Sequence, residues 1–229
     1  MSMAGRIIIA VAVSAAVWVF HSDLTSDLNA QSAPRVFEVD RSRSNVFVVT
    51  HRSGLFSFLA HDHAILATEW SATLCWTDAY TLRGAGTIQV AAQGLVIDSD
   101  SARGLARLGA GPSPGQARDL QQKILTQRYL AAATYPRLTL DRVQVYRSSV
   151  DRLEVQGVLT IRDRSLPVRF PVEISGGPDG VHLRGVLKVR QSDFGIRPES
   201  VARVVRVADQ VDIHFDLLES SARMSCDDE

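Results

Sequence analysis

Residues 153–161 read LEVQGVLTI, in which apolar and polar side chains alternate. Successive side chains of a strand point to opposite faces, so this period of two predicts a strand with one buried face and one wet face. The same pattern recurs along the chain, at residues 46–51, 138–146, 181–189 and 211–217. Further strands are expected at residues 37–40, 68–76, 86–97 and 168–175.

Short polar or glycine-rich segments separate these strands, at residues 147–149, 162–164 and 176–180. Consecutive strands joined by short turns run antiparallel, and about eight of them in one domain form a closed barrel or a sandwich. One insertion interrupts the pattern, with a Ser/Gly/Pro/Ala-rich loop at residues 98–115 and a short helix at residues 116–127. The sequence therefore predicts one all-β domain with one inserted loop and helix.

The composition indicates a globular domain that does not bind nucleic acid. Of the 229 residues, 45% are hydrophobic and 22% are charged, which suits a packed core. The 25 Lys and Arg residues balance the 25 Asp and Glu residues, so no overall basic field attracts nucleic acid. The two cysteines, Cys75 and Cys226, form a disulfide in one interpretation and remain separate thiols in the other.

Residues 1–30 are predicted to be a signal peptide. A basic residue precedes an apolar run at residues 7–20, which suits a secretory signal and is short for a membrane-spanning helix. An uncleaved N-terminal anchor is the alternative. Both interpretations place a domain at residues 36–218 in the periplasm or outside the cell, followed by a polar tail at residues 219–229.

Four separated segments resemble the YceI family in their order and spacing. They are FEVD with SNVFVVTH (residues 37–40 and 44–51), YL with YPRLTL (129–130 and 135–140), VQGVLTI running to LPVRF (155–170), and SDFGI with VADQVDI (192–196 and 207–213). The resemblance covers nearly the whole chain after the signal peptide. It implies an exported, lipocalin-like antiparallel β-barrel, with an apolar tunnel that holds a long amphipathic lipid or a polyisoprenoid.

The chain departs from the family pattern in two places. Gln191 stands where the family often carries Arg before Ser-Asp-Phe-Gly, and Arg190 lies one position earlier. Because a shift of one position turns a strand side chain to the other face, Arg190 is not expected to bind a lipid head group. The paired histidines of His61-Asp62-His63 are the second departure, and they indicate a separate branch of the family.

The strand at residues 46–51 presents Phe47, Val49 and His51 on one face. If that face lines the cavity, His51 is a polar anchor in a mostly apolar pocket, as lipid head groups require. Beyond the strand, Phe56 and Phe58 either pack in the core or gate the cavity. The predicted ligand-binding residues are Phe47, Val49, His51, Phe56, Phe58, His61 and His63.

The histidines also suit a zinc or copper site. In an extended segment His61 and His63 share a face about 6.6 Å apart, and His51 would be the third ligand. The alternative is that both are hydrogen-bonded residues that shape the mouth of the barrel.

Binding rather than catalysis is the expected function. The sequence carries no nucleophile elbow, phosphate-cradling glycine loop or zinc-protease motif, so an enzyme is not expected. The main hypothesis is an exported protein that sequesters or carries an isoprenoid or fatty lipid. The alternatives are an exported metal-binding protein and a non-catalytic envelope-stress or interaction module with a filled barrel. A membrane enters only as the lipid source or through the anchor, and a homodimer stays open.

Overall fold

The computed structural model describes residues 35–54, 61–77, 81–82, 86–177, 180–198, 200–201, 205–220 and 224–225. Within them the fold is mostly β, with two short α-helices, and none of their helices is long and apolar enough to cross a membrane. The strands are β1 (Arg35–Phe37), β2 (Asn45–Ser53), β3 (His63–Ala67), β4 (Trp70–Thr77), β5 (Thr81–Leu82), β6 (Gly86–Ala91), β7 (Leu95–Ile97), β8 (Arg137–Arg147), β9 (Arg152–Ile161), β10 (Arg164–Gly177), β11 (Gly180–Arg190), β12 (Ser200–Val201), β13 (Val205–Leu218) and β14 (Met224–Ser225). The helices are α1 (Asp100–Leu105), α2 (Pro114–Ile124) and the 3-10 turns η3 (Ala92–Gly94) and η4 (Gln191–Phe194).

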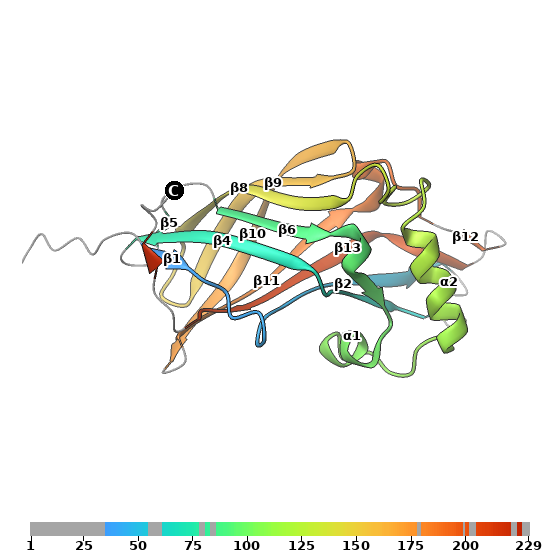
Figure 1. The fold of residues 1–229 in the computed structure, drawn as a ribbon, viewed down its shortest axis with the longest axis horizontal. Helices are drawn as coiled ribbons and strands as arrows, with labels where there is room; N and C mark the ends of the chain where they lie inside the picture. The colour runs from blue at the N-terminus through green and yellow to red at the C-terminus, as the bar shows by residue number, and fades with distance from the viewer. Residues whose placement is uncertain are drawn as a thin grey trace, which may run out of the picture. The chain divides into compact units, whose positions relative to one another are not determined.

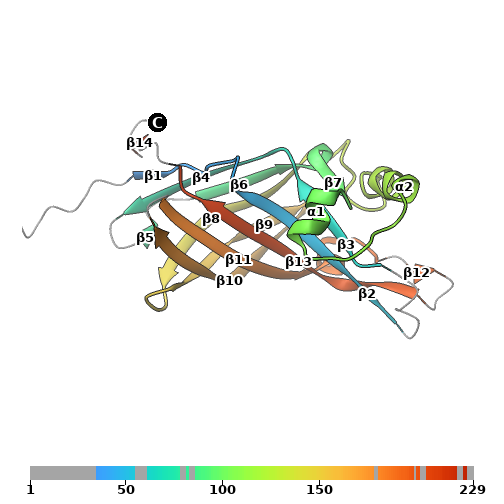
Figure 2. The same cartoon turned by 90° about the horizontal axis from the view of Figure 1, so that it is seen from below.

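The strands form one curled antiparallel sheet (Figures 1 and 2). Its strands follow the order β14-β1-β4-β6-β8-β9-β10-β11-β13-β2-β3-β7. The long hairpins β8–β9–β10–β11 make its centre, as the alternating stretches predicted. Both views place α2 at the same end of the sheet as β12.

Two corners bend the sheet, and the second falls within a segment that the sequence predicted as one strand. The strand β3 was not predicted. Only Thr68 and Glu69 separate β3 from β4, and only η3 separates β6 from β7. Across the corners, the Thr68 N–H donates to the Gly94 carbonyl at 2.8 Å and the Ala91 N–H donates to the Glu69 carbonyl at 2.9 Å. The expected strand at residues 86–97 is therefore broken at η3, and it pairs with β4 before the break and with β3 after it.

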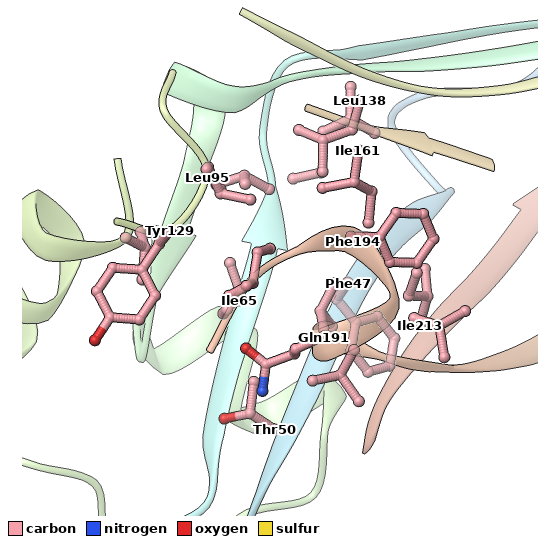
Figure 3. Close-up of a pocket in the computed structure, with 18 of the residues that line it drawn as sticks. Phe47, Thr50, Ile65, Leu95, Tyr129, Leu138, Ile161, Gln191, Phe194 and Ile213 are labelled. Atoms are coloured by element: carbon pink, nitrogen blue, oxygen red, sulfur yellow. The ribbon is translucent and has the colours of Figure 1, made fainter. Parts of the chain in front are cut away.

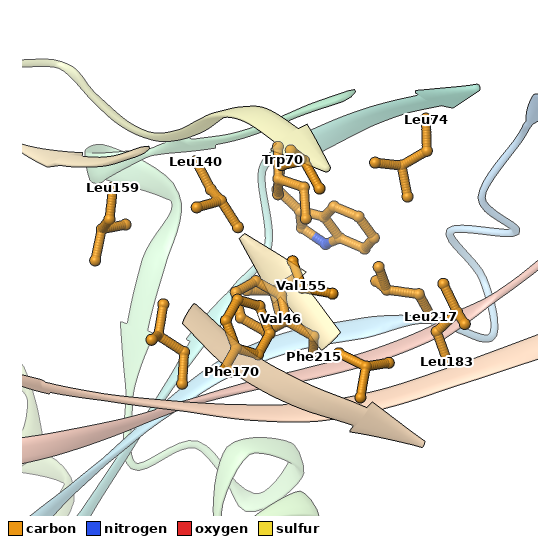
Figure 4. Close-up of a cluster of buried hydrophobic side chains, with 14 of the residues drawn as sticks. Val46, Trp70, Leu74, Leu140, Val155, Leu159, Phe170, Leu183, Phe215 and Leu217 are labelled. Atoms are coloured by element: carbon orange, nitrogen blue, oxygen red, sulfur yellow. The ribbon is translucent and has the colours of Figure 1, made fainter. Parts of the chain in front are cut away.

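The apolar core lies inside the curled sheet (Figure 4). Its aromatic centre is the pair Phe170 and Phe215, whose ring centroids lie 5.5 Å apart. Gly185 makes room for this pair, because a Cβ there would lie 3.3 Å from the Phe170 ring and 2.7 Å from Val172. Each fully buried Phe, Leu or Val side chain contributes about 1.5–3 kcal/mol, so this core provides much of the stability of the domain.

The inserted segment differs from the prediction in two ways. Residues 98–115 were expected to be a loop but contain α1, whose N-cap Ser99 accepts a hydrogen bond from the Ala102 N–H. The second helix begins at Pro114 and not at residue 116, because Ser113 and Gln116 form a capping box and Pro suits the first helical position. Gln121 holds α2 against β7, accepting from the Ile97 N–H at 2.9 Å and donating to the Leu95 carbonyl.

The Ser-Asp-Phe-Gly segment forms η4, and the Phe194 side chain is buried inside the curled sheet with 1% exposure. Asp209 caps this turn, accepting from the Ser192 N–H at 2.8 Å and from its hydroxyl at 2.6 Å. Gly195 ends it in the left-handed conformation with φ of 71°.

Gly195→Ala is expected to lower the free energy of unfolding by about 1–2 kcal/mol, the cost of a side chain in left-handed backbone. The new Cβ would also lie 3.3 Å from the Arg164 guanidinium. Urea denaturation measures the effect. Gly176→Ala is the matched control, because a Cβ there meets nothing within 4 Å. Equal losses in the two variants would contradict the proposed strain.

Candidate functional site

An apolar cavity lies between the curled sheet and α2 (Figure 3). Its volume is about 230 Å³, larger than the roughly 150 Å³ of an engineered apolar cavity that takes up benzene. Strands β2, β3, β6 to β9, β11 and β13 line it, together with η4 and α2. The α2 side chains are Leu120, Lys123 and Ile124, so this helix closes one side of the cavity.

The strand register divides the cavity wall into rows. One row, called the lower row here, crosses β11, β13, β2 and β3, with Leu187, Ile213, Val48 and Ile65 in direct cross-strand pairs. The last three of these residues line the cavity. The row two residues along each strand consists of Val189, Val211, Thr50 and His63. All four residues of this second row line the cavity. The wall is therefore apolar in the lower row and becomes polar in the second row, where β2 and β3 contribute Thr50 and His63.

Four other polar residues line the cavity: Lys123, Tyr129, Thr139 and Gln191. Gln191 follows Val189 by two residues, lines the cavity and donates from its side-chain nitrogen to the Ala208 carbonyl at 2.9 Å. Arg190 is exposed and is not among the lining residues. Lys123 and Tyr129 line the cavity from α2 and from the segment that follows it.

His63 is held by a buried ionic cluster. Its Nδ1 lies 2.6 Å from one carboxylate oxygen of Asp98, whose side chain is 1% exposed. The other oxygen of Asp98 accepts from Arg103 Nη1 at 2.6 Å and from the Ala64 N–H at 3.1 Å. Arg103 also donates to the carbonyls of Asp62, Gly109 and Ala110, so it ties the insertion to the start of β3.

These contacts keep Asp98 ionised. Burial acts to raise the pKa of Asp98, but hydrogen bonds from His63 and Ala64, the charge of His63 and the hydrogen bond from Arg103 more than offset it. The net effect lowers the pKa of Asp98 below its ordinary value of 3.8. A charged carboxylate accepts and does not donate, so Asp98 fixes a proton on His63 Nδ1.

The predicted cavity face of β2 was wrong for two of its three residues. Thr50 pairs directly with His63 and lines the cavity, so its chain neighbours Val49 and His51 point to the other face. Val49 is buried but is not a lining residue, and His51 lies 3.3 Å from the Asp212 carboxylate. Phe47 is among the lining residues, and its ring stacks on His214 with centroids 4.5 Å apart.

The same register separates the proposed metal ligands. His51 and His63 lie on opposite faces of the β2–β3 pair, so they cannot share an ion. His61 is exposed and precedes β3. Among the described residues, no group of three or more His, Cys, Asp or Glu side chains is arranged to hold a metal. Phe56, Phe58 and Cys226 lie outside the described residues, as does the apolar run at residues 7–20.

The family follows from a sequence comparison. The model of the YceI-like domain matches residues 37–218. The chain belongs to the YceI-like domain family. The resemblance that the four segments indicated is thus confirmed, whereas the comparisons do not address a separate His-Asp-His branch. A search of curated protein sequences gave no match.

Solved structures share the YceI-like fold at low sequence identity. The crystal structure of Burkholderia cenocepacia BcnA is 19% identical with a TM-score of 0.59, and the match covers 80% of this chain and 100% of that one. A Campylobacter jejuni YCEI protein, which crystallizes with large solvent channels, is 14% identical with a TM-score of 0.49. That match covers 70% of this chain and 84% of the other.

Several site residues of this YceI-like domain were not predicted from the sequence. Asp98 and Arg103 lie in the segment expected to be a loop, and Thr50 was assigned to the opposite face. One signal in the sequence was available. Asp98 directly follows the predicted strand at residues 86–97, where a charged side chain at a strand end is a candidate partner for a nearby histidine.

Proposed function

We propose that this chain binds one amphipathic lipid, with an isoprenoid or fatty chain in the cavity and a polar head group at the Thr50–His63 end. The observation that carries the proposal is the apolar cavity whose polar wall residues Thr50, His63 and Gln191 lie at one end. Membership of a family known to bind polyisoprenoids supports it. The YceI-like family is generally non-catalytic, and the proposed role is to sequester or carry the lipid.

The driving force is burial of the lipid chain. Each CH₂ group moved out of water contributes about 0.8 kcal/mol. The part of the lipid chain that enters the cavity gains this amount for each CH₂ group, before the cost of association is subtracted. A barrel filled by its own side chains, as an interaction module would have, leaves no space for this gain. The empty volume of about 230 Å³ therefore favours lipid binding over that alternative.

The same proposal includes a closed barrel in an exported protein. The bent strands β3–β4 and β6–β7 stay bonded through both corners, which supports the proposal. In the proposed barrel, a ring of eight strands runs from β2 through these two bent strands to β8, β9, β10, β11, β13 and back to β2. A ring of this size is either filled by its own side chains or holds one small ligand, and the cavity favours the second case. The apolar run at residues 7–20 supports export, and the periplasm or the cell exterior is the proposed location.

Titration of the delipidated protein with a fluorescent fatty-acid probe tests the proposal. We expect saturable binding at one site with a Kd of roughly micromolar or tighter, and displacement of the probe by farnesol. Treatment with EDTA is expected to leave the affinity unchanged, whereas a metal-dependent site would lose it. Folded protein that binds neither the probe nor farnesol would refute the proposed function.

A further inference from the structure

We infer that His63, oriented by Asp98, accepts a hydrogen bond from a hydroxyl group on the lipid head. The inference rests on the proposed function and specifies its ligand. The head-group class is a neutral O–H donor, such as an alcohol or a phenol. The arguments are the second ring nitrogen of His63, the charge balance of its cluster, and the place of His63 in the cavity wall.

The first argument concerns the second ring nitrogen of His63. In the neutral imidazole, a proton fixed on Nδ1 leaves a lone pair on Nε2, which makes Nε2 an acceptor. Nδ1 is occupied by Asp98 at 2.6 Å, and no group of the described chain bonds to Nε2. His63 itself lines the cavity with its side chain 21% exposed. A ligand hydroxyl there satisfies a polar atom that otherwise faces an apolar space.

The second argument concerns charge. Asp98 and Arg103 form a close ion pair at 2.6 Å, so the cluster presents no net charge while the imidazole is neutral. Arg103 donates four hydrogen bonds, one to Asp98 and one each to the carbonyls of Asp62, Gly109 and Ala110. A cluster without net charge offers an anionic head group no electrostatic attraction at His63. Lys123 also lines the cavity, so a phosphate head group is the competing class that a test must include.

The third argument is position. His63 and Thr50 are direct cross-strand partners, so their Cβ atoms lie about 4.5–5.5 Å apart on the cavity face. The rows below them are apolar. A hydroxyl bound at His63 therefore leaves its hydrocarbon chain in contact with Val48, Ile65 and Ile213. A second polar group lies within reach, because the Thr50 hydroxyl shares this face.

The test compares three probes with the same chain: farnesol, its methyl ether and farnesyl phosphate. Calorimetric titration of the full chain is expected to show farnesol binding roughly tenfold tighter than the ether, the effect of one buried hydrogen bond. The phosphate is expected to bind more weakly than farnesol. His63→Leu is expected to abolish the preference for farnesol while retaining binding of the ether. His63→Gln, which keeps an acceptor oxygen, is expected to restore part of it.

His61→Leu is the matched control, because His61 is exposed, lies two residues away and does not line the cavity. It is expected to leave the preference unchanged. Circular dichroism establishes that each variant is folded, and the wild-type comparison of the three probes stands without any variant. Equal affinities for farnesol and the ether, tighter binding of the phosphate, or an unchanged preference in His63→Leu would each overturn the inference. Binding of none of the three by the wild type would overturn the proposed function as well.

Discussion

Val189→Trp is expected to weaken lipid binding at least about 100-fold. Val189 lies in the cavity row of Val211, Thr50 and His63, so an indole there occupies space through which the lipid chain must pass. Excluding about four CH₂ groups costs roughly 3 kcal/mol, and each 1.4 kcal/mol is a factor of ten in Kd. Titration with the fluorescent fatty-acid probe measures the loss.

Lys188→Trp is the matched control for this prediction. Lys188 neighbours Val189 on β11, and its side chain is 63% exposed on the opposite face. The same residue type is therefore introduced one position away without entering the cavity. Unchanged affinity in the Lys188 variant and lost affinity in the Val189 variant place the ligand inside the curl. Retained affinity in a folded Val189→Trp protein would place the ligand elsewhere.

Asp98→Ala is expected to lower the free energy of unfolding by about 3–5 kcal/mol, because it leaves Arg103 buried without its ionic partner. The Arg103 side chain is 10% exposed and that of Asp98 is 1% exposed, so water replaces the lost contacts poorly. Asp119→Ala, on the exposed side of α2, is the control and is expected to change stability by less than about 0.5 kcal/mol. Chemical denaturation measures both.

The pH dependence of the free energy of unfolding is a second test of the Asp98→Ala prediction. The folded state lowers the pKa of Asp98, so the carboxylate binds fewer protons when folded than when unfolded. Its contribution is fully present above the unfolded pKa of about 3.9 and is lost as the pH falls through the lower folded value. The stability difference between wild type and Asp98→Ala should therefore shrink below about pH 4. A difference that stays constant or grows there would contradict the assigned charge state.

The alternation of side chains predicted the long strands well, but it did not determine which face of β2 points inward. Apolar residues occupy both faces of this strand, with Val46 and Val48 on one and Phe47 and Val49 on the other. The face that carries Phe47 and Val49 is also buried, since Phe47 stacks on His214 and Val49 is 6% exposed. When both faces of a strand are apolar, the alternation does not show which face points into the cavity. The pairing of β2 with β13 and β3 was needed to decide this.

The candidate site was predictable in part, since the sequence marked His63 but not its partners. Asp98 lies 35 residues from His63 along the chain, and the two meet because β3 pairs with β7. Arg103 reaches them from α1, a six-residue helix in a segment whose Ser, Gly and Ala content is typical of loops. Helices this short depend on tertiary contacts, which local sequence does not reveal.

Native mass spectrometry of the protein purified from its own host tests the central claim most directly. The account predicts one bound lipid with a hydroxylated head group per chain, retained by wild type and by Lys188→Trp and absent from Val189→Trp. A wild-type protein that is reproducibly empty, and that stays empty after incubation with farnesol, would contradict it.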